Sequence, residues 1–200
     1  MKIKHILKAV FISSTFASHS YASDVSYNFL QASIVSTEVD TSSYISDKSI
    51  DGSGIILQGS FPVNEDIYLI ATANIQSFDY NIDTEYLSLG LGYHTNVLGA
   101  DISAGLSMLA ADVEPPISSN DDKGTLVFAS LRKRINNKYE FGLNYSQSDL
   151  FDDTFNETSI SFLISTPANS QLVIMYSNLD SSDTRGDANS ISFGFRRNYK

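Results

Sequence analysis

Beyond residue 22, hydrophobic and polar side chains alternate along most of the chain with a period of two. The clearest segments are 87–94, 139–146, 159–165 and 190–196. In the first of them, leucine and tyrosine occupy the odd positions, while serine, glycine and histidine occupy the even ones. Successive side chains of a β-strand point to opposite faces. The pattern therefore predicts strands with one bulky apolar face and one small polar face.

Strand-like segments recur through to the C-terminus. We expect ten of them, at residues 26–38, 49–62, 66–80, 84–95, 98–112, 123–135, 138–149, 156–166, 170–180 and 187–199. Tight turns are expected near 63–65, 95–97, 136–137 and 167–169, and more acidic, mostly longer connections near 39–48, 81–83, 113–122, 150–155 and 181–186. Eight strands remain an alternative if two weak segments, such as 170–180 and its neighbour, are misread.

Short turns at one end, longer loops at the other, and both termini on the short-turn side are typical of an outer-membrane barrel. Lipid offers backbone groups no hydrogen-bond partner, so strands cross it only as a closed ring. The prediction is thus an all-β fold, a closed antiparallel up-and-down transmembrane β-barrel. A soluble lipocalin-like barrel also alternates, but it would bury its bulky face inside. Here the second face consists of Gly, Ser, Asn and Gln, which suits a narrow lumen better.

The first residues have the features of an export signal. Lys2, Lys4 and Lys8 precede a largely apolar stretch, and Ser20-Tyr21-Ala22 matches a small-x-small cleavage site. We therefore expect residues 1–22 to be a signal peptide and residues 23–200 to be one barrel domain, located in the cell outer membrane. An N-terminal helix is the alternative, but the stretch contains no acidic residue.

Composition narrows the function classes. The chain has no Cys and a formal net charge of −10, and the predicted cleavage would remove three lysines and no acid. An acidic surface argues against nucleic acid as a partner, since nucleic-acid binding needs a basic footprint. No stretch approaches the roughly 18 apolar residues of a spanning helix.

Three segments, 27–31, 51–54 and 88–94, give the chain a resemblance to small proteobacterial outer-membrane β-barrel proteins of the OmpA and OmpX type. The resemblance implies a location and a fold, with outer-membrane lipid and lipopolysaccharide as surroundings. It also implies that periplasmic chaperones and the barrel-assembly machinery act during biogenesis. It supplies no catalytic residue.

The last segment resembles the C-terminal signal that the barrel-assembly machinery reads. Arg197 interrupts its apolar row and Lys200 follows the terminal aromatic, which departs from the usual pattern. The residues of the same parity that would form this signal are Ile191, Phe193, Phe195 and Tyr199.

Catalytic chemistry finds little support in the side chains. After signal cleavage the remaining histidine is His94, which lies beside a predicted periplasmic turn, whereas known barrel hydrolases place their chemistry toward the outer rim. Adjacent carboxylates at 121–122 and 152–153 are typical of solvated loops rather than of an acid/base pair held at a fixed separation. We expect neither an enzyme nor a cofactor.

A cluster of charges is expected inside the barrel, near its periplasmic end. Charges buried in a narrow barrel must be paired, because an isolated one costs several kcal/mol. We predict a salt-bridged plug in which three arginines face two acids, and an alternative in which these groups face water. The cluster consists of His94, Asp101, Arg132, Arg134, Glu140 and Arg196.

One acidic loop is a candidate cation site, because Asp180, Asp183 and Asp187 surround Gly186 and Ca²⁺ takes several oxygen ligands from a loop. The segment lacks the 12-residue pattern and its bidentate Glu, so no metal is assigned. The leading functional class is a structural or surface-interaction protein with a largely occluded lumen and acidic extracellular loops. A narrow, porin-like solute channel is the alternative, and a barrel hydrolase or a soluble lipocalin-like binder ranks lower.

Overall fold

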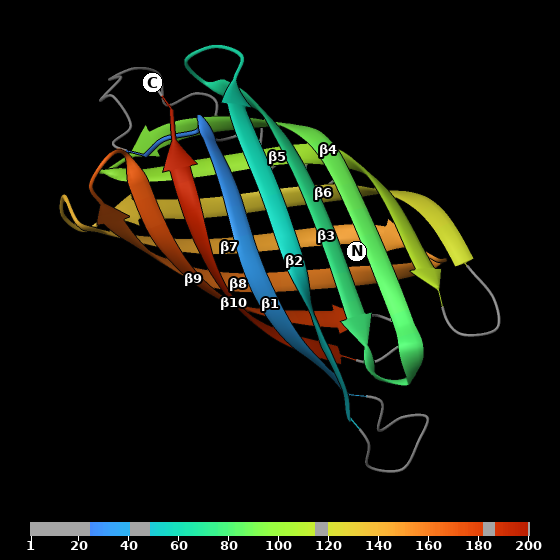
Figure 1. The fold of residues 1–200 in the computed structure, drawn as a ribbon. Helices are drawn as coiled ribbons and strands as arrows, with labels where there is room; N and C mark the ends of the chain where they lie inside the picture. The colour runs from blue at the N-terminus through green and yellow to red at the C-terminus, as the bar shows by residue number, and fades with distance from the viewer. Residues whose placement is uncertain (1–24, 41–48, 115–119, 182–186, 200) are drawn as a thin grey trace.

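A computed structural model describes residues 25–40, 49–114, 120–181 and 187–199. Ten strands lie within these residues, and each pairs antiparallel with its neighbours in the chain (Figure 1). A short 3-10 turn, η2 (Asp79–Asn81), separates the third and fourth strands. The strands are β1 (Phe29–Asp40), β2 (Ser49–Pro62), β3 (Ile67–Phe78), β4 (Ile82–Val97), β5 (Ala100–Glu114), β6 (Asn120–Arg134), β7 (Tyr139–Leu150), β8 (Asp153–Thr166), β9 (Ser170–Ser181) and β10 (Asp187–Asn198).

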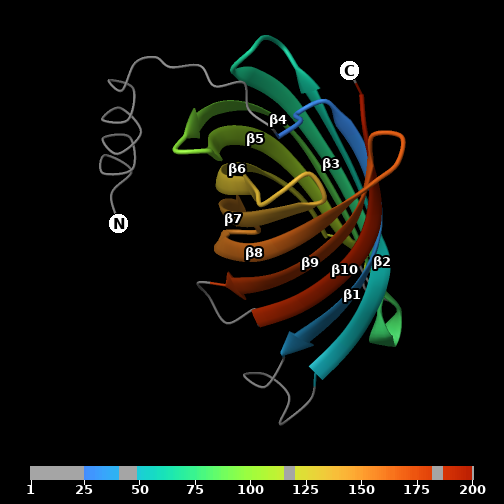
Figure 2. The ribbon, with the colours of Figure 1, turned by 90° about the vertical axis from the view of Figure 1, so that its left-hand side faces the viewer.

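The first and last strands close the barrel. β1 pairs with β10 along its whole length, from Phe29 opposite Asn198 to Asp40 opposite Asp187, and Figure 2 shows β1 between β2 and β10. Closure leaves no sheet edge whose backbone groups lack partners. The predicted closed ten-stranded barrel is confirmed for the described residues, and the eight-stranded alternative is wrong.

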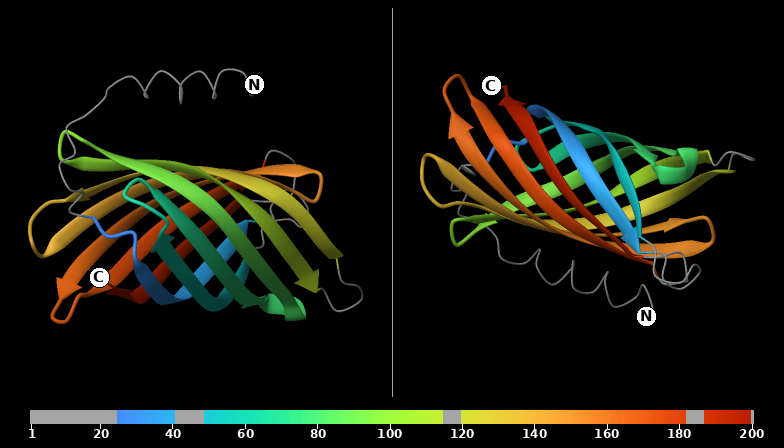
Figure 3. Two further views of the ribbon diagram at one scale, coloured as in Figure 1. Left: turned by 90° about the horizontal axis from the view of Figure 1, so that it is seen from above. Right: turned by 60° about the horizontal axis from the view of Figure 1, so that its bottom comes forward.

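The two ends of the barrel differ. We call the end with the connections 63–66, 98–99, 135–138 and 167–169 the turn end, and the opposite end the loop end. Both Asn28 and Tyr199 lie at the turn end, where the Tyr199 N–H donates to the Asn28 carbonyl at 2.8 Å. The front and back walls cross obliquely (Figure 3), as tilted strands of a closed barrel do.

One turn lies slightly further along the chain than predicted. The expected turn at 95–97 is found at Leu98 and Gly99, which have positive φ angles of 53° and 74°. Two-residue hairpin turns of the tightest type need positive φ at both positions, which glycine adopts without cost. Gly99 thus sets the turn, and β4 continues to Val97.

The outer face carries the apolar side chains. Leu87, Leu89 and Leu91 of β4 are 58%, 61% and 52% exposed, while the intervening residues of the strand point inward. A soluble barrel would bury such a row, so the lipocalin-like alternative does not fit this polarity. Within the part of the chain that the structure describes, no helix is long and apolar enough to span a membrane.

Replacing Leu89 by Arg at mid-height on this face should destabilise the barrel in lipid by about 2–4 kcal/mol, the cost of a cation at the bilayer midplane. Thr95→Arg, on the same outer face of β4 but near the turn end, should cost about 0–1 kcal/mol. Urea unfolding in lipid vesicles measures both. Equal costs at the two positions would contradict a lipid-facing belt.

Candidate functional site

The six residues of the predicted charge cluster lie on the inner face at the turn end. They come from five strands: His94 from β4, Asp101 from β5, Arg132 and Arg134 from β6, Glu140 from β7 and Arg196 from β10. Asp101 and Glu140 are each only 1% exposed. Alternation brings them inside, because each shares its parity with the small inward residues of its strand.

Arg132 and Glu140 form the ion pair at the centre of the cluster. The Arg132 Nε donates to Glu140 Oε1 at 2.8 Å, and Arg132 Nη2 lies 2.6 Å from the same oxygen. Gln171 of β9 donates from Nε2 to the second carboxylate oxygen at 3.4 Å. Charge-assisted bonds of this kind are short and strong, so the pair links the neighbouring strands β6 and β7, and Gln171 extends the link to β9 along the inner face.

Residues that precede β1 enter the lumen and join the cluster. The Ser26 carbonyl accepts a hydrogen bond from Arg132 Nη1 at 3.1 Å, and the Ser60 hydroxyl donates to the Tyr27 carbonyl at 2.7 Å. The Tyr27 hydroxyl donates to Asp101. Burial raises the pKa of Tyr27 above its usual range, so the hydroxyl keeps the proton that it donates.

Three rings stack beside this segment. The centroid of Tyr27 lies 4.0 Å from that of His94 and 4.3 Å from that of Tyr68. Gly92, inward-facing on β4, makes room for Tyr68, since a Cβ at that position would lie 2.2 Å from Tyr68 Cζ. Glycine at this position therefore leaves the space that the Tyr68 ring occupies on the inner face.

His94 and Asp101 are in contact, with 3.2 Å between Nδ1 and Oδ2. In a hydrolytic triad the imidazole also activates a nucleophile. Here the His94 ring stacks on Tyr27, and the nearby Ser103 hydroxyl bonds to Ser130 at 2.7 Å and to the Tyr68 hydroxyl at 3.1 Å. The pair thus anchors the N-terminal segment rather than presenting a nucleophile.

The structure differs from the expected pairing for two arginines. Arg196 donates from Nε and Nη2 to the Gln31 amide oxygen at 2.9 and 2.7 Å, and its guanidinium lies 3.9 Å from the Phe29 ring centroid. Among the described residues, neither Arg196 nor Arg134 has a carboxylate within ion-pair distance. The reason is that the two carboxylate oxygens of Glu140 are already bonded to Arg132 and Gln171.

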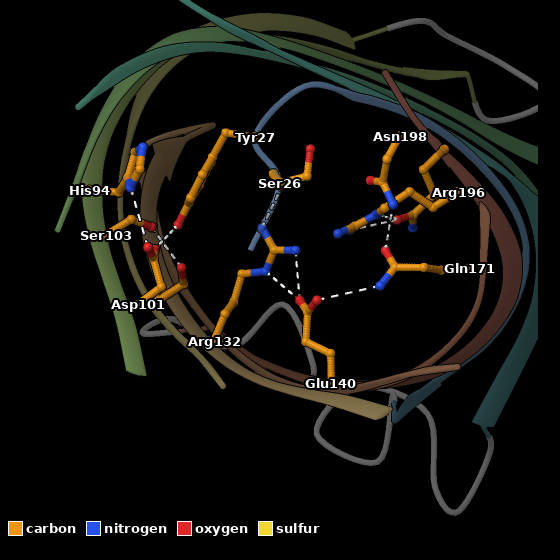
Figure 4. Close-up of polar contacts among 12 residues, drawn as sticks. Ser26, Tyr27, His94, Asp101, Ser103, Arg132, Glu140, Gln171, Arg196 and Asn198 are labelled. Carbon is orange, nitrogen blue, oxygen red and sulfur yellow. Dashed lines mark hydrogen bonds and ion pairs between the residues drawn. The ribbon is translucent and has the colours of Figure 1, made fainter. Parts of the chain in front are cut away.

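Together these contacts form one chain of polar groups across the lumen, which we call the polar bridge (Figure 4). It runs from Asp101 through Tyr27 and Ser26 to Arg132 and Glu140. From Glu140 it continues through Gln171 to Asn198, whose Nδ2 donates to Gln171 Oε1 at 3.2 Å.

Sequence reasoning placed the charges but missed their neutral partners. It did not include Tyr27, Gln31, Tyr68 or Gln171 in the cluster, because a polar or aromatic residue in a strand has many ordinary explanations. The signal was available at Gln31 and Gln171, which are long polar side chains at inward positions where Ser and Gly predominate. That Tyr27 enters the lumen follows from the path of the chain before β1, which no period-two pattern encodes.

Tyr27→Phe tests the contribution of this hydroxyl. Loss of its bond to the buried Asp101 should lower the unfolding free energy by about 1–3 kcal/mol. Tyr93→Phe is the matched control, since Tyr93 lies on the outer face of the same end and is exposed. Thermal unfolding of both variants in detergent micelles measures the difference, and an unchanged Tyr27→Phe variant would mean that this bond adds nothing.

The other predicted sites lie elsewhere. Asp180 and Asp187 are exposed at the loop end, and Asp183 lies outside the described residues; within the described residues no group of three or more His, Cys, Asp or Glu side chains is placed to hold a metal ion. The residues expected to guide assembly point outward from β10 or just beyond it, and their recognition stays a prediction. They are Ile191, Phe193, Phe195 and Tyr199.

Comparison with known proteins gives a fold without a family. No protein-family model matches the sequence, and no curated protein matches it. Among solved structures, the β domain of the Bordetella autotransporter BrkA is 11% identical, with 85% of this chain and 98% of that one covered, at a TM-score of 0.55. Neisserial surface protein A is 12% identical (86% and 96% covered, TM-score 0.43), and an outer membrane channel from Pseudomonas putida F1 is 8% identical (92% and 100%, TM-score 0.48).

Identities this low show the fold alone, and of the three structures the BrkA domain has the highest TM-score. Its likeness agrees with the closed antiparallel topology and with the apolar outer face. The chain therefore has the fold of an outer-membrane β-barrel protein.

Proposed function

We propose that the protein resides in the outer membrane as a non-enzymatic barrel that is closed at its turn end, with a structural or surface-interaction role for its loop end. In barrels of this type short turns face the periplasm and longer loops face the medium. The turn end would then be periplasmic and the loop end extracellular.

The observation that carries this proposal is the polar bridge at the turn end. Ser26 and Tyr27 occupy the lumen there, and the ion pair of Arg132 and Glu140 ties them to the opposite wall. A solute would have to break bonds to buried charges in order to pass, which is costly. The bridge therefore favours a closed barrel over an open diffusion pore.

The distribution of charge supports a role for the loop end. Acidic side chains face each other directly across neighbouring strands there, at Glu38 and Asp51, and at Glu85 and Asp112. Like charges in such positions oppose folding. The stability of the fold gives no reason for them, so we assign them to contacts at the cell surface.

A narrow solute channel is the second candidate. The inner face between the two ends carries small residues, among them Gly54, Ser88 and Gly90. Such a lumen would conduct only if the N-terminal segment left it.

Planar bilayer recordings of the purified protein separate the two. A closed barrel should leave the current at its baseline, with insertion verified by a shift in gel mobility between boiled and unboiled samples. Steady single-channel steps that persist after further purification would refute closure and favour the channel. Measured adhesion of cells that express the protein, compared with cells that lack it, tests the surface role separately.

A further inference from the structure

A cavity of about 480 Å³ opens at the turn end of the barrel, on the outer side of the polar bridge. We call it the vestibule. Its walls include the turns 135–138 and 167–169, and Ser26, Gln171 and Asn198 of the bridge contribute to its lining. Pockets that hold small molecules are typically about 300–1,000 Å³. The vestibule is thus large enough for a small organic molecule.

The lining is polar and positively charged. Arg134 is the one charged side chain among the described lining residues, and most of the others supply hydroxyl or amide groups, such as those of Ser165, Ser170 and Asn137. No Asp or Glu is among the described residues that line it. A negatively charged molecule would therefore meet hydrogen-bond donors and a cation without an opposing carboxylate.

Two guanidinium groups near the vestibule have an N–H group without a hydrogen-bond acceptor and no carboxylate as a counter-charge. The Nε of Arg134 and the Nη1 of Arg196 are buried and have no hydrogen-bond acceptor among the described residues. Neither arginine has a carboxylate within ion-pair distance there, because Arg132 occupies Glu140. Arg134 is half-buried. A partly buried cation without a counter-charge is unfavourable, and an anion beside Arg134 would relieve that cost.

The described Lys and Arg side chains are concentrated at the turn end, which also favours an anion as the ligand. Lys123 is the one described Lys or Arg at the loop end; the other six, Arg132, Lys133, Arg134, Lys138, Arg196 and Arg197, lie at the turn end. The protein as a whole is acidic, so this end is locally attractive to anions even though the whole chain repels them.

We propose that the vestibule is a binding site for a small organic anion that carries a carboxylate or phosphate group. The anionic group accepts hydrogen bonds from the Arg134 guanidinium, whose planar fork matches the geometry of both head groups. The hydroxyl and amide groups of the lining hold the rest of the molecule. Binding here does not depend on whether the lumen conducts or on what the loop end contacts.

Isothermal titration of the purified, folded protein with citrate and, separately, with inorganic phosphate tests the site. We expect saturable binding of at least one of them, and the better of the two identifies the preferred head group. Arg134→Gln should weaken binding at least tenfold. Lys133→Gln is the matched control: it removes the same charge from the next residue, whose side chain points outward, and should change affinity less than twofold.

Arg134→Lys adds a second variant that keeps the charge but loses the fork, and it should weaken binding severalfold if the head group is held in a bidentate manner. The gel-mobility shift on boiling verifies that each variant is folded. Absence of saturable heat with both anions would overturn the proposal. So would equal losses in Arg134→Gln and Lys133→Gln, because they would show general electrostatic attraction without a site.

Discussion

Replacing Glu140 by Ala should lower the unfolding free energy by about 3–5 kcal/mol, the cost of leaving one member of a buried ion pair without its partner. Glu140 is 1% exposed and is bonded to Arg132 and Gln171. Its loss leaves the guanidinium of Arg132, a residue that is 9% exposed, without a counter-charge inside the barrel. Urea unfolding of the barrel in detergent micelles, followed by circular dichroism, measures the loss.

A double variant sharpens this expectation. Removing both charges together, in Arg132→Met with Glu140→Leu, should restore most of the stability, since a hydrophobic pair of similar volume is often no worse than a buried ion pair. Glu65→Ala, an acid of the exposed turn 63–66, should leave stability unchanged. Should Glu140→Ala behave like Glu65→Ala, the ion pair would not hold the turn end together.

Much of this fold could be predicted from alternation alone. A shift of one residue would turn every apolar side chain of a strand into the lumen, so the pattern specifies which side chains face lipid wherever it is regular. β4 shows this clearly, with leucine at each outward position from 87 to 91. The same parity correctly places Arg132 and Glu140 inside.

The partners of those charges could not be predicted in the same way. Which carboxylate forms an ion pair with which arginine depends on side-chain length and on which other groups in the lumen bond to the same carboxylate. Arg196 instead binds Gln31 on the adjacent strand and covers the Phe29 ring. Parity gives the face on which a side chain lies, whereas its contacts depend on the height of each strand and on the path of residues 25–28.

The acidic residues at the two ends of the barrel have different surroundings. At the turn end the buried acids Asp101 and Glu140 are each bonded to donors of the polar bridge. At the loop end, acids such as Glu85 and Asp112 oppose each other on the outer surface. The first arrangement stabilises the barrel and the second does not, which is why closure and surface contact are separate parts of the proposed function.

If the polar bridge closes the lumen, removing its side chains should open a path for ions. A triple variant, Tyr27→Ala, Arg132→Ala and Glu140→Ala, takes away the central side chains of the bridge and removes both members of the ion pair together, while Asp101 keeps its contact with His94. We expect steady current steps in planar bilayers where the unmodified protein gives none. The space that the Tyr27 ring, the Arg132 guanidinium and the Glu140 carboxylate fill would become a path for water and ions.

The matched control removes similar side chains from the outer surface of the same end, with Tyr93→Ala, Lys133→Ala and Glu65→Ala. These residues lie outside the lumen, so the control should stay silent. Steps in both variants would mean that conductance reflects general loosening of the barrel. Silence in both, with each protein folded and inserted, would place the barrier elsewhere in the lumen, because the bridge would then not be what keeps solutes out.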